Sequence, residues 1–130
     1  MIDHLSIAVA DIGKARAFYD AALAPLRAAR PMDFDRDDAS VSAYGRDGKP
    51  SFWIGERRYG QATQMPGHIA FSAQNRAKVD AFDHAALAAG GANDGAPGLR
   101  PHYHANYYGA YARDPNGNKL CVVCHRAEGF

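Results

Sequence analysis

The sequence predicts a mixed α+β fold in which two tandem βαβββ modules form a concave, barrel-like mixed sheet with the helices on its outside. Two observations predict it. The segment from residue 4 to residue 24 recurs 64 residues later with eight identities in 21 positions and no gap. Each copy also runs from an alternating strand pattern into an amphipathic helix. Both indicate the duplication of one unit.

The first half begins with a strand and a helix. Residues 2–10 alternate apolar with small or polar side chains, which predicts a strand with one apolar face. Asp11 stands where an N-cap would, and residues 12–23 carry apolar side chains at helical spacing until Pro25 ends the run. Three weaker strand patterns complete the unit, at residues 28–34, 39–44 and 51–54.

The second half follows the same plan. It predicts, in order, a strand, a helix and two final strands, at residues 68–72, 76–89, 107–113 and 119–125. Asp114-Pro-Asn-Gly117 joins the last two strands and fits a type I turn. The stretch between Gly90 and Tyr107 is rich in glycine and proline and is predicted as a long loop.

The composition describes one compact domain with little net charge. The 130 residues carry a formal charge of +1, with both signs interspersed. We expect a single domain over residues 1–130, with one module over about 1–56, a linker over 57–66 and a second module over about 67–126. No basic patch predicts nucleic-acid binding, and no leader or membrane span is recognisable, so we expect a cytoplasmic protein with a small-molecule partner.

Two histidines hold the same place in the two copies. His4 and His68 each lie on the strand face whose other members are small side chains, so this face is predicted to line a cavity. Two facing imidazoles would supply the nitrogen ligands that zinc, iron, nickel and copper accept. The alternative is that each is an ordinary hydrogen-bonded histidine at the start of a strand.

Several short motifs accompany the duplication. They are Ile2-Asp-His4, Asp11-Ile followed by Ala17-Phe18-Tyr19, Gly67-His68-Ile-Ala-Phe and Asp114-Pro-Asn-Gly117-Asn. Together they resemble the vicinal oxygen chelate superfamily, which includes glyoxalase I, extradiol dioxygenases, fosfomycin-modifying enzymes and bleomycin-binding proteins. The resemblance covers essentially the whole chain and implies the fold, with His4 and His68 in two metal-ligand positions. It does not select a reaction, because members of this group catalyse several.

The resemblance also implies a carboxylate on the last strand, four residues after the glycine of the turn, and Cys121 stands there. A thiolate would complete a ligand set with the two histidines and favour zinc or copper over the Fe(II) of extradiol dioxygenases. The alternative is a lost metal site in which Cys121 is a small pocket residue. In the first unit, Glu56 is a fallback ligand or base, or else an exposed charge at a strand end.

Histidines and tyrosines concentrate between residues 100 and 111. Such side chains combine apolar walls with polar tips and suit a small, partly oxygenated or aromatic ligand. We predict proton transfer by His104 or Tyr108. The predicted substrate contacts are Trp53, Arg100 and Tyr111. Tyr107 and Tyr111 also fit an alternative in which they pack against the other unit or a partner chain.

Two functions fit these observations. One is a metal-dependent lyase or isomerase, in which a divalent ion such as Zn, Ni, Mn or Fe, held by His4, His68 and Cys121, acts as a Lewis acid on adjacent substrate oxygens. The other is a metal-free protein that binds a small molecule or drug on the same scaffold. The resemblance further implies a homodimer.

Overall fold

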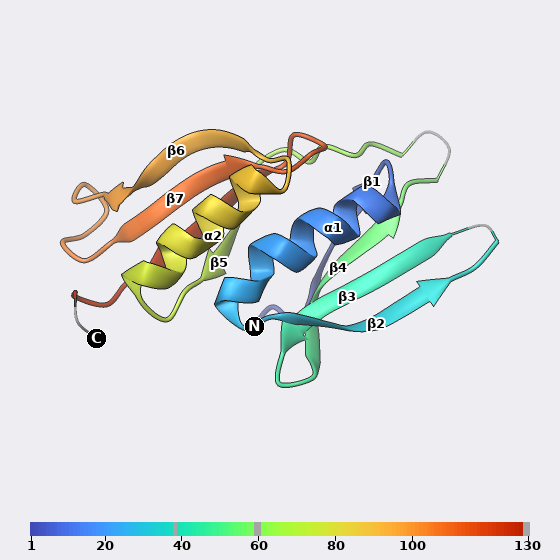
Figure 1. Ribbon diagram of the computed structural model, residues 1–130, viewed down its shortest axis with the longest axis horizontal. Coiled ribbons are helices and arrows are strands. Elements are labelled where there is room, and N and C mark those ends of the chain that lie inside the picture. The colour runs from blue at the N-terminus through green and yellow to red at the C-terminus, as the bar shows by residue number, and fades with distance from the viewer. Residues whose placement is uncertain (38, 59–60, 129–130) are drawn as a thin grey trace.

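The computed structural model describes residues 1–37, 39–58 and 61–128. The first module consists of β1 (Leu5–Val9), α1 (Ile12–Leu23), the 3-10 turn η1 (Ala24–Leu26), β2 (Ala29–Asp35), β3 (Ser40–Arg46) and β4 (Lys49–Glu56). The second consists of β5 (His68–Ser72), α2 (Arg76–Ala88), β6 (Ala92–Leu99), β7 (Tyr108–Arg113) and β8 (Lys119–Cys124). The α+β class and the two repeated modules are confirmed (Figure 1).

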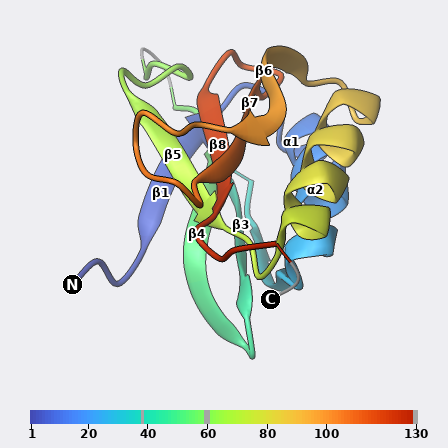
Figure 2. The same ribbon diagram turned by 90° about the vertical axis from the view of Figure 1, so that its left-hand side faces the viewer.

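Each module forms its own four-stranded sheet with the same topology. The strand orders are β1-β4-β3-β2 and β5-β8-β7-β6. In both, the first strand runs parallel to the last and the remaining pairs are antiparallel. Both helices cover one side of the sheets and leave the other side open (Figure 2). Neither helix in the described part of the chain is long and apolar enough to cross a membrane.

The predicted barrel-like closure is wrong for a single chain. No hydrogen-bonded strand pair joins the two sheets among the described residues. The modules meet through side chains on the helix side instead, because α1 packs beside α2 and the Phe52 ring of β4 lies edge-on to the Phe71 ring of β5 at 5.3 Å. The sheet faces turned away from the helices take no part in this contact between the modules.

The helix boundaries follow the sequence closely. The Asp11 side chain accepts a hydrogen bond from the backbone N–H of Lys14 at 3.0 Å, as expected of an N-cap. Asn75 does the same for Lys78 at 2.9 Å at the start of α2. The apolar faces bury equivalent residues of the repeat, such as Phe18 and Phe82, in one continuous core.

The predicted loop before residue 107 contains a strand that the sequence analysis missed. β6 pairs with β7, but its register shifts twice, around Gly95 and before Gly98. Gly95 has a φ of 149°, and an added Cβ would lie 3.2 Å from the Tyr111 ring. Glycine and proline therefore replace the alternating side chains by which a strand is recognised. Only the shorter β6–β7 connection, residues 100–107, is a loop.

The predicted linker over residues 57–66 contains positions 59 and 60, which lie outside the described residues. The second half of the linker is held by Asn118, whose side chain accepts from the Met65 N–H at 2.8 Å and donates to the Thr63 carbonyl at 2.9 Å. The Asp114 to Gly117 turn closes as predicted, with the Gly117 N–H donating to the Asp114 carbonyl at 2.9 Å.

Candidate functional site

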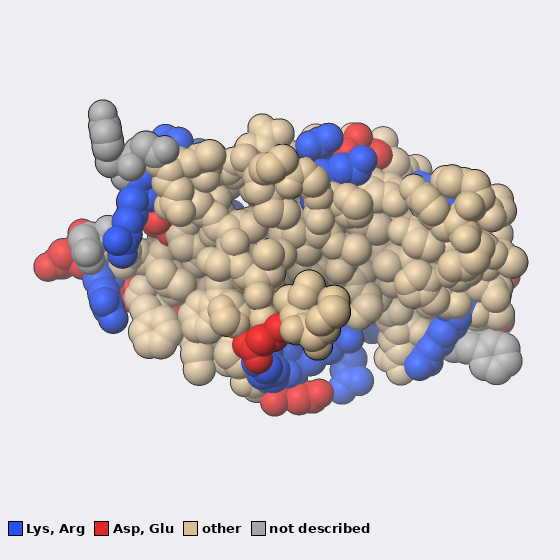
Figure 3. Space-filling model, turned by 180° about the vertical axis from the view of Figure 1, so that it is seen from behind, with Lys and Arg blue, Asp and Glu red and all other residues tan. Residues whose placement is uncertain are grey.

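The side of the sheets away from the helices carries most of the predicted site residues. Seen from this side, most of the surface is uncharged and the charged side chains gather toward the rim (Figure 3). Alternation decides which residues point there, because neighbours such as Ile7 and Ile54 face the helices and lie in the core. The two sheets differ in what they present on this open side.

The open face of the first sheet carries an aromatic pair. Trp53 of β4 and Phe34 of β2 lie with ring centroids 6.4 Å apart and planes within 14° of parallel. Trp53 is half-buried, whereas Phe34 is 48% exposed. The strand neighbours of Trp53 are Ser6 and Ala43, which are small. The result is a flat apolar platform.

The open face of the second sheet is covered by its own β6–β7 connection (Figure 2). The Tyr107 hydroxyl lies 3.6 Å from Cys121 Sγ and 3.4 Å from the Tyr111 hydroxyl. Cys121 is fully buried in consequence. Burial raises the pKa of Tyr107, and the hydrogen bond with Tyr107 raises the pKa of Tyr111. Both phenols therefore stay protonated near neutral pH.

The two histidines are exposed and lie on different modules. His4 precedes β1, and its Nδ1 lies 2.7 Å from Asp3 Oδ1. Asp3 also accepts from Lys49 Nζ at 2.9 Å, and these hydrogen bonds from His4 and Lys49 lower its pKa. His68 begins β5 with its ring 6.3 Å from the Tyr111 ring. Among the described residues, no three metal-ligating side chains come together, so one chain does not assemble the expected ligand set.

The Glu56 side chain binds the start of α1 rather than the open face. Its Oε2 accepts a hydrogen bond from the Ile12 N–H at 3.2 Å, at the first turn of α1. A carboxylate there satisfies a free helix N–H and complements the helix dipole. Glu56 thus points to the helix side with its strand neighbours Phe52 and Ile54, away from the open face.

The predicted proton-transfer residues do not converge on one site. His104 Nδ1 accepts from the Asn106 N–H at 3.1 Å, so its Nε2 carries the hydrogen and donates to His125 Nδ1 at 2.7 Å. The Tyr108 hydroxyl lies on the helix side and donates to Asp80 of α2 at 2.6 Å, which raises the pKa of Tyr108 to about 12. Tyr108 thus lies on the helix side of β7, whereas His104 belongs to the β6–β7 connection.

Of the predicted substrate contacts, Arg100 and Tyr111 are neighbours and Trp53 is on the other sheet. The Arg100 guanidinium lies over the Tyr111 ring, 5.8 Å from its centroid, and donates to the Ala96 carbonyl at 2.8 Å. Sequence reasoning missed Phe34, the partner of Trp53. Its alternation with Met32 in β2 was the available signal, because both are exposed apolar residues of one strand.

The fold of this chain is shared with known proteins. The chain matches the Glyoxalase/Bleomycin resistance protein/Dioxygenase superfamily over residues 1–122. No curated protein sequence matches it significantly. A solved structure of a glyoxalase/bleomycin resistance protein from Albidiferax ferrireducens T118 superposes with a TM-score of 0.77 at 30% identity, covering 93% of this chain and 96% of that chain.

More distant structures share the fold. A glyoxylase/bleomycin resistance protein/dioxygenase domain from Frankia sp. EAN1pec has a TM-score of 0.74 at 20% identity, covering 97% of this chain and 98% of that one. Glyoxalase I from Zea mays has a TM-score of 0.73 at 21% identity, covering 95% of this chain and 45% of that one. The match over almost the whole chain shows that this protein belongs to the Glyoxalase/Bleomycin resistance protein/Dioxygenase superfamily.

Proposed function

We propose that this protein binds a flat, largely uncharged small molecule on the open face of its first sheet, without a metal ion. The observation that carries the proposal is the Trp53–Phe34 platform, with its near-parallel rings and its half-exposed outer ring. An aromatic ligand that extends this stack has favourable offset contacts worth about 0.5–1.5 kcal/mol for each ring pair beyond the burial of apolar area.

The surroundings of the platform support an uncharged ligand. Ser6 and Ala43 flank Trp53 on the neighbouring strands, and Met32 adds exposed apolar surface on β2. A charged group buried here would lose its hydration without a partner, which is unfavourable. Cys121 stands where the resemblance implies a carboxylate ligand, and no three metal-ligating side chains come together among the described residues of one chain, so its donor set does not fit a metal centre.

A homodimer belongs to this proposal. The platform side chains Phe34 and Met32 are exposed large apolar residues, which a second copy would cover. A partner chain that lays its second sheet over this face would convert the open platform into a cavity that encloses most of the ligand. The active binding unit is then a pair of chains.

The single tryptophan makes the proposal directly testable. Trp53 is the only tryptophan among the 130 residues, so tryptophan fluorescence, excited selectively over that of tyrosine, reports on this face alone. We expect planar neutral aromatics, such as naphthalenediol and quinoline, to quench it saturably. Phe34→Ala is expected to weaken binding about tenfold, since it removes one stacking wall. The matched control is Leu87→Ala, an exposed apolar residue of α2 on the helix side. Quenching without saturation, or equal loss in both variants, would contradict the proposal.

A metal-dependent lyase or isomerase is the second candidate function. It is favoured by the hydrogen bond between His4 Nδ1 and Asp3, because a carboxylate on one imidazole nitrogen orients the other as a metal ligand. Zn, Ni, Mn or Fe held by His4, His68 and Cys121 would supply Lewis-acid stabilisation of a developing oxyanion. These residues lie on separate modules, so such a centre requires ligands from two copies.

This candidate has its own experiment. Purified protein would be incubated with each metal, separated by size and analysed for metal content per chain. Stoichiometric metal on a dimer that both His4→Ala and His68→Ala abolish would support it, with His84→Ala as an exposed control. If all three variants retain the metal equally, or if none of the three retains it, this ligand set is excluded.

A further inference from the structure

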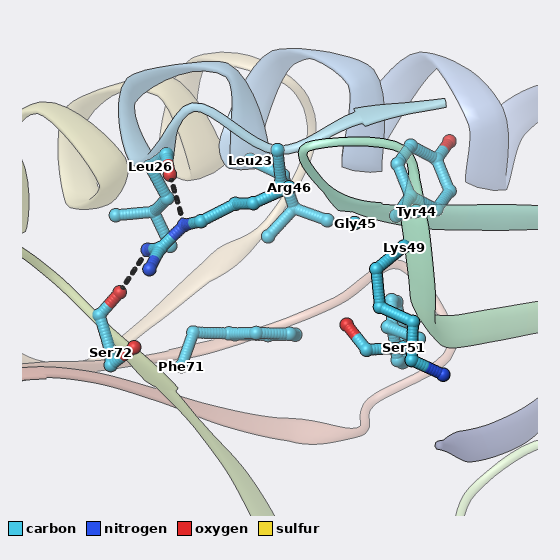
Figure 4. A pocket seen from close by; sticks show the side chains of 11 residues that line it. Leu23, Leu26, Tyr44, Gly45, Arg46, Lys49, Ser51, Phe71 and Ser72 are labelled. Atoms are coloured by element: carbon cyan, nitrogen blue, oxygen red, sulfur yellow. Dashed lines mark hydrogen bonds between the residues drawn. The ribbon is translucent and has the colours of Figure 1, made fainter. Parts of the chain in front are cut away.

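We propose that the junction between the two modules holds a second binding site, for an anion with a short apolar body. Two adjoining pockets of about 240 and 430 Å³ lie there and share Leu26, Arg46 and Ser72. Figure 4 shows Arg46 spanning from η1 to β5 across this junction. Trp53 is not among the lining residues of either pocket, so the site is separate from the platform.

The inner pocket is mainly apolar, with Arg46 and Lys49 as its cationic lining residues. It is walled by side chains of both modules, namely Leu23, Leu26, Tyr44, Phe52 and Phe71. Phe52 and Phe71 belong to different sheets and pack against each other at its base. Ligand pockets in proteins typically enclose about 300–1,000 Å³, and the two adjoining pockets together fall in that range. A chain of a few carbon atoms would be desolvated here.

The outer pocket is cationic. Its lining includes four cationic side chains and one carboxylate: Arg27, Arg46, Lys78, Arg126 and Asp47. No salt bridge within the described residues involves any of these four cations. Their charges are therefore not neutralised by the chain itself, and their summed field attracts an anion to the mouth of the apolar chamber.

Arg46 is held in place before any ligand arrives. Its Nε donates to the Leu26 carbonyl at 2.7 Å, and its Nη2 donates to the Ser72 carbonyl at 2.6 Å. Its Nη1 has no hydrogen-bond partner within the described residues, so further N–H groups are available to an anion. A guanidinium that is already ordered loses little entropy on binding and can engage a carboxylate with two bonds.

The backbone around the outer pocket is also unusual. Arg27 and Asp47 are the two non-glycine residues of the described chain with positive φ, at 63° and 54°, and both line this pocket. Asp47 is accounted for by the Asp47-Gly48 turn between β3 and β4, whose geometry needs positive φ. Arg27 is the C-cap of η1 and ends it in the left-handed conformation common at helix C-termini, with its N–H donating to the Ala24 carbonyl at 3.0 Å, so both positive φ values belong to tight turns that border the pocket.

The first experiment compares three probes by titration into uniformly ¹⁵N-labelled protein. Hexanoate carries both the anionic head and the apolar body, acetate only the head and hexanol only the body. We expect saturable amide shifts at Leu26, Phe71 and Ser72 with hexanoate, no shift of the Trp53 indole N–H, and at least about tenfold weaker binding of acetate and hexanol. Equal binding of hexanol, or shifts centred on Trp53, would overturn the proposal.

The second experiment removes charge from the mouth. Lys78→Gln combined with Arg126→Gln is expected to weaken hexanoate binding about tenfold or more, because charge-assisted contacts to the head are lost. Lys14 is the repeat partner of Lys78 at the same place in α1, outside both pockets, so Lys14→Gln is the matched control. Unchanged binding in the double variant, or equal weakening in the control, would refute the site. Thermal unfolding verifies that each variant is folded.

Discussion

Trp53 and Cys121 occupy equivalent positions in the two modules, although the 64-residue offset of the repeat does not align them. Trp53 of β4 pairs with Ser6 of β1, and Cys121 of β8 pairs with Ala70 of β5 in the same parallel register. Because Ser6 and Ala70 are repeat partners, the register makes Trp53 and Cys121 counterparts. An indole forms a platform in one module, and a thiol lies beneath Tyr107 in the other.

Removing the Tyr107 ring should expose this thiol. Cys121 and Cys124 are both free and buried, and they point to opposite faces of β8, since Cys124 lies in the core. We expect native protein to react slowly with a thiol reagent and Tyr107→Ala to react on the order of ten times faster or more, at one thiol per chain. Cys121→Ser in the same background should remove that reaction. A fast phase that survives this change would contradict the packing described here.

The Tyr19 hydroxyl links the modules. It donates to Asp114 Oδ2 at 2.6 Å, and both residues are buried. We expect Tyr19→Phe to lower the free energy of unfolding by about 2 kcal/mol, because a buried carboxylate loses one donor. Asp114 keeps its bonds from Asn116 and Asn118, which limits the loss. Urea unfolding at neutral pH measures it, with Tyr103→Phe, an exposed tyrosine, as the control.

Tyr19 also predicts how stability depends on alkaline pH. Burial, followed by the nearby Asp114 charge, raises its pKa well above 10. The unfolded chain ionises this phenol near its ordinary pKa of 10, whereas the folded chain keeps it protonated. The Tyr19 phenol therefore has no effect on the free energy of unfolding below pH 10, and it lowers that free energy progressively as the pH rises above 10. Tyr19→Phe should make this fall shallower, and an unchanged slope would show that other groups cause it.

Asp83 stands at the repeat position of Tyr19 but has no comparable partner. Its Oδ1 is buried without a hydrogen bond among the described residues. Burial, with repulsion from Asp80 as the second cause, raises its pKa above 3.8. We therefore expect Asp83→Ala to stabilise the protein by up to about 1 kcal/mol at pH 7.

The pH dependence separates this effect from simple helix propensity. The penalty for burying the Asp83 carboxylate is complete above its raised pKa and shrinks as the pH falls through that pKa toward 3.8, so the electrostatic part of the difference should vanish below 3.8. Asp80→Ala on the same helix is the control, and it should destabilise slightly because Asp80 accepts the Tyr108 hydroxyl. A stabilisation by Asp83→Ala that is independent of pH would point to propensity alone.

Arg46 should contribute to stability as well as to the proposed anion site. Its two bonds, to the Leu26 and Ser72 carbonyls, join η1 to the second module. We expect Arg46→Met to lower the free energy of unfolding by about 1–3 kcal/mol, since the stem is kept but two carbonyls lose a charged donor. Lys14→Met, an exposed cation on α1, provides the control in urea unfolding. Equal midpoints in the two variants would contradict this role.

The sequence predicted those features that depend on neighbouring residues along the chain. Asp11 begins its helix at the predicted position, because an N-cap contact spans only three residues. The Asp114 to Gly117 turn follows from an equally local rule. β6 was missed because its glycines and proline give no alternation, and the strand exists only through its pairing with β7.

By itself, the sequence determined the duplication, its modules, the family resemblance and the loss of a carboxylate at Cys121. The tertiary structure alone decided which side chains meet. It turned Glu56 to the start of α1, placed Phe34 on Trp53 and folded Tyr107 over Cys121. It also left the sheets unclosed and put Arg46 between the modules. These contacts join residues far apart along the chain, and no local propensity specifies such pairings because they depend on how whole modules pack.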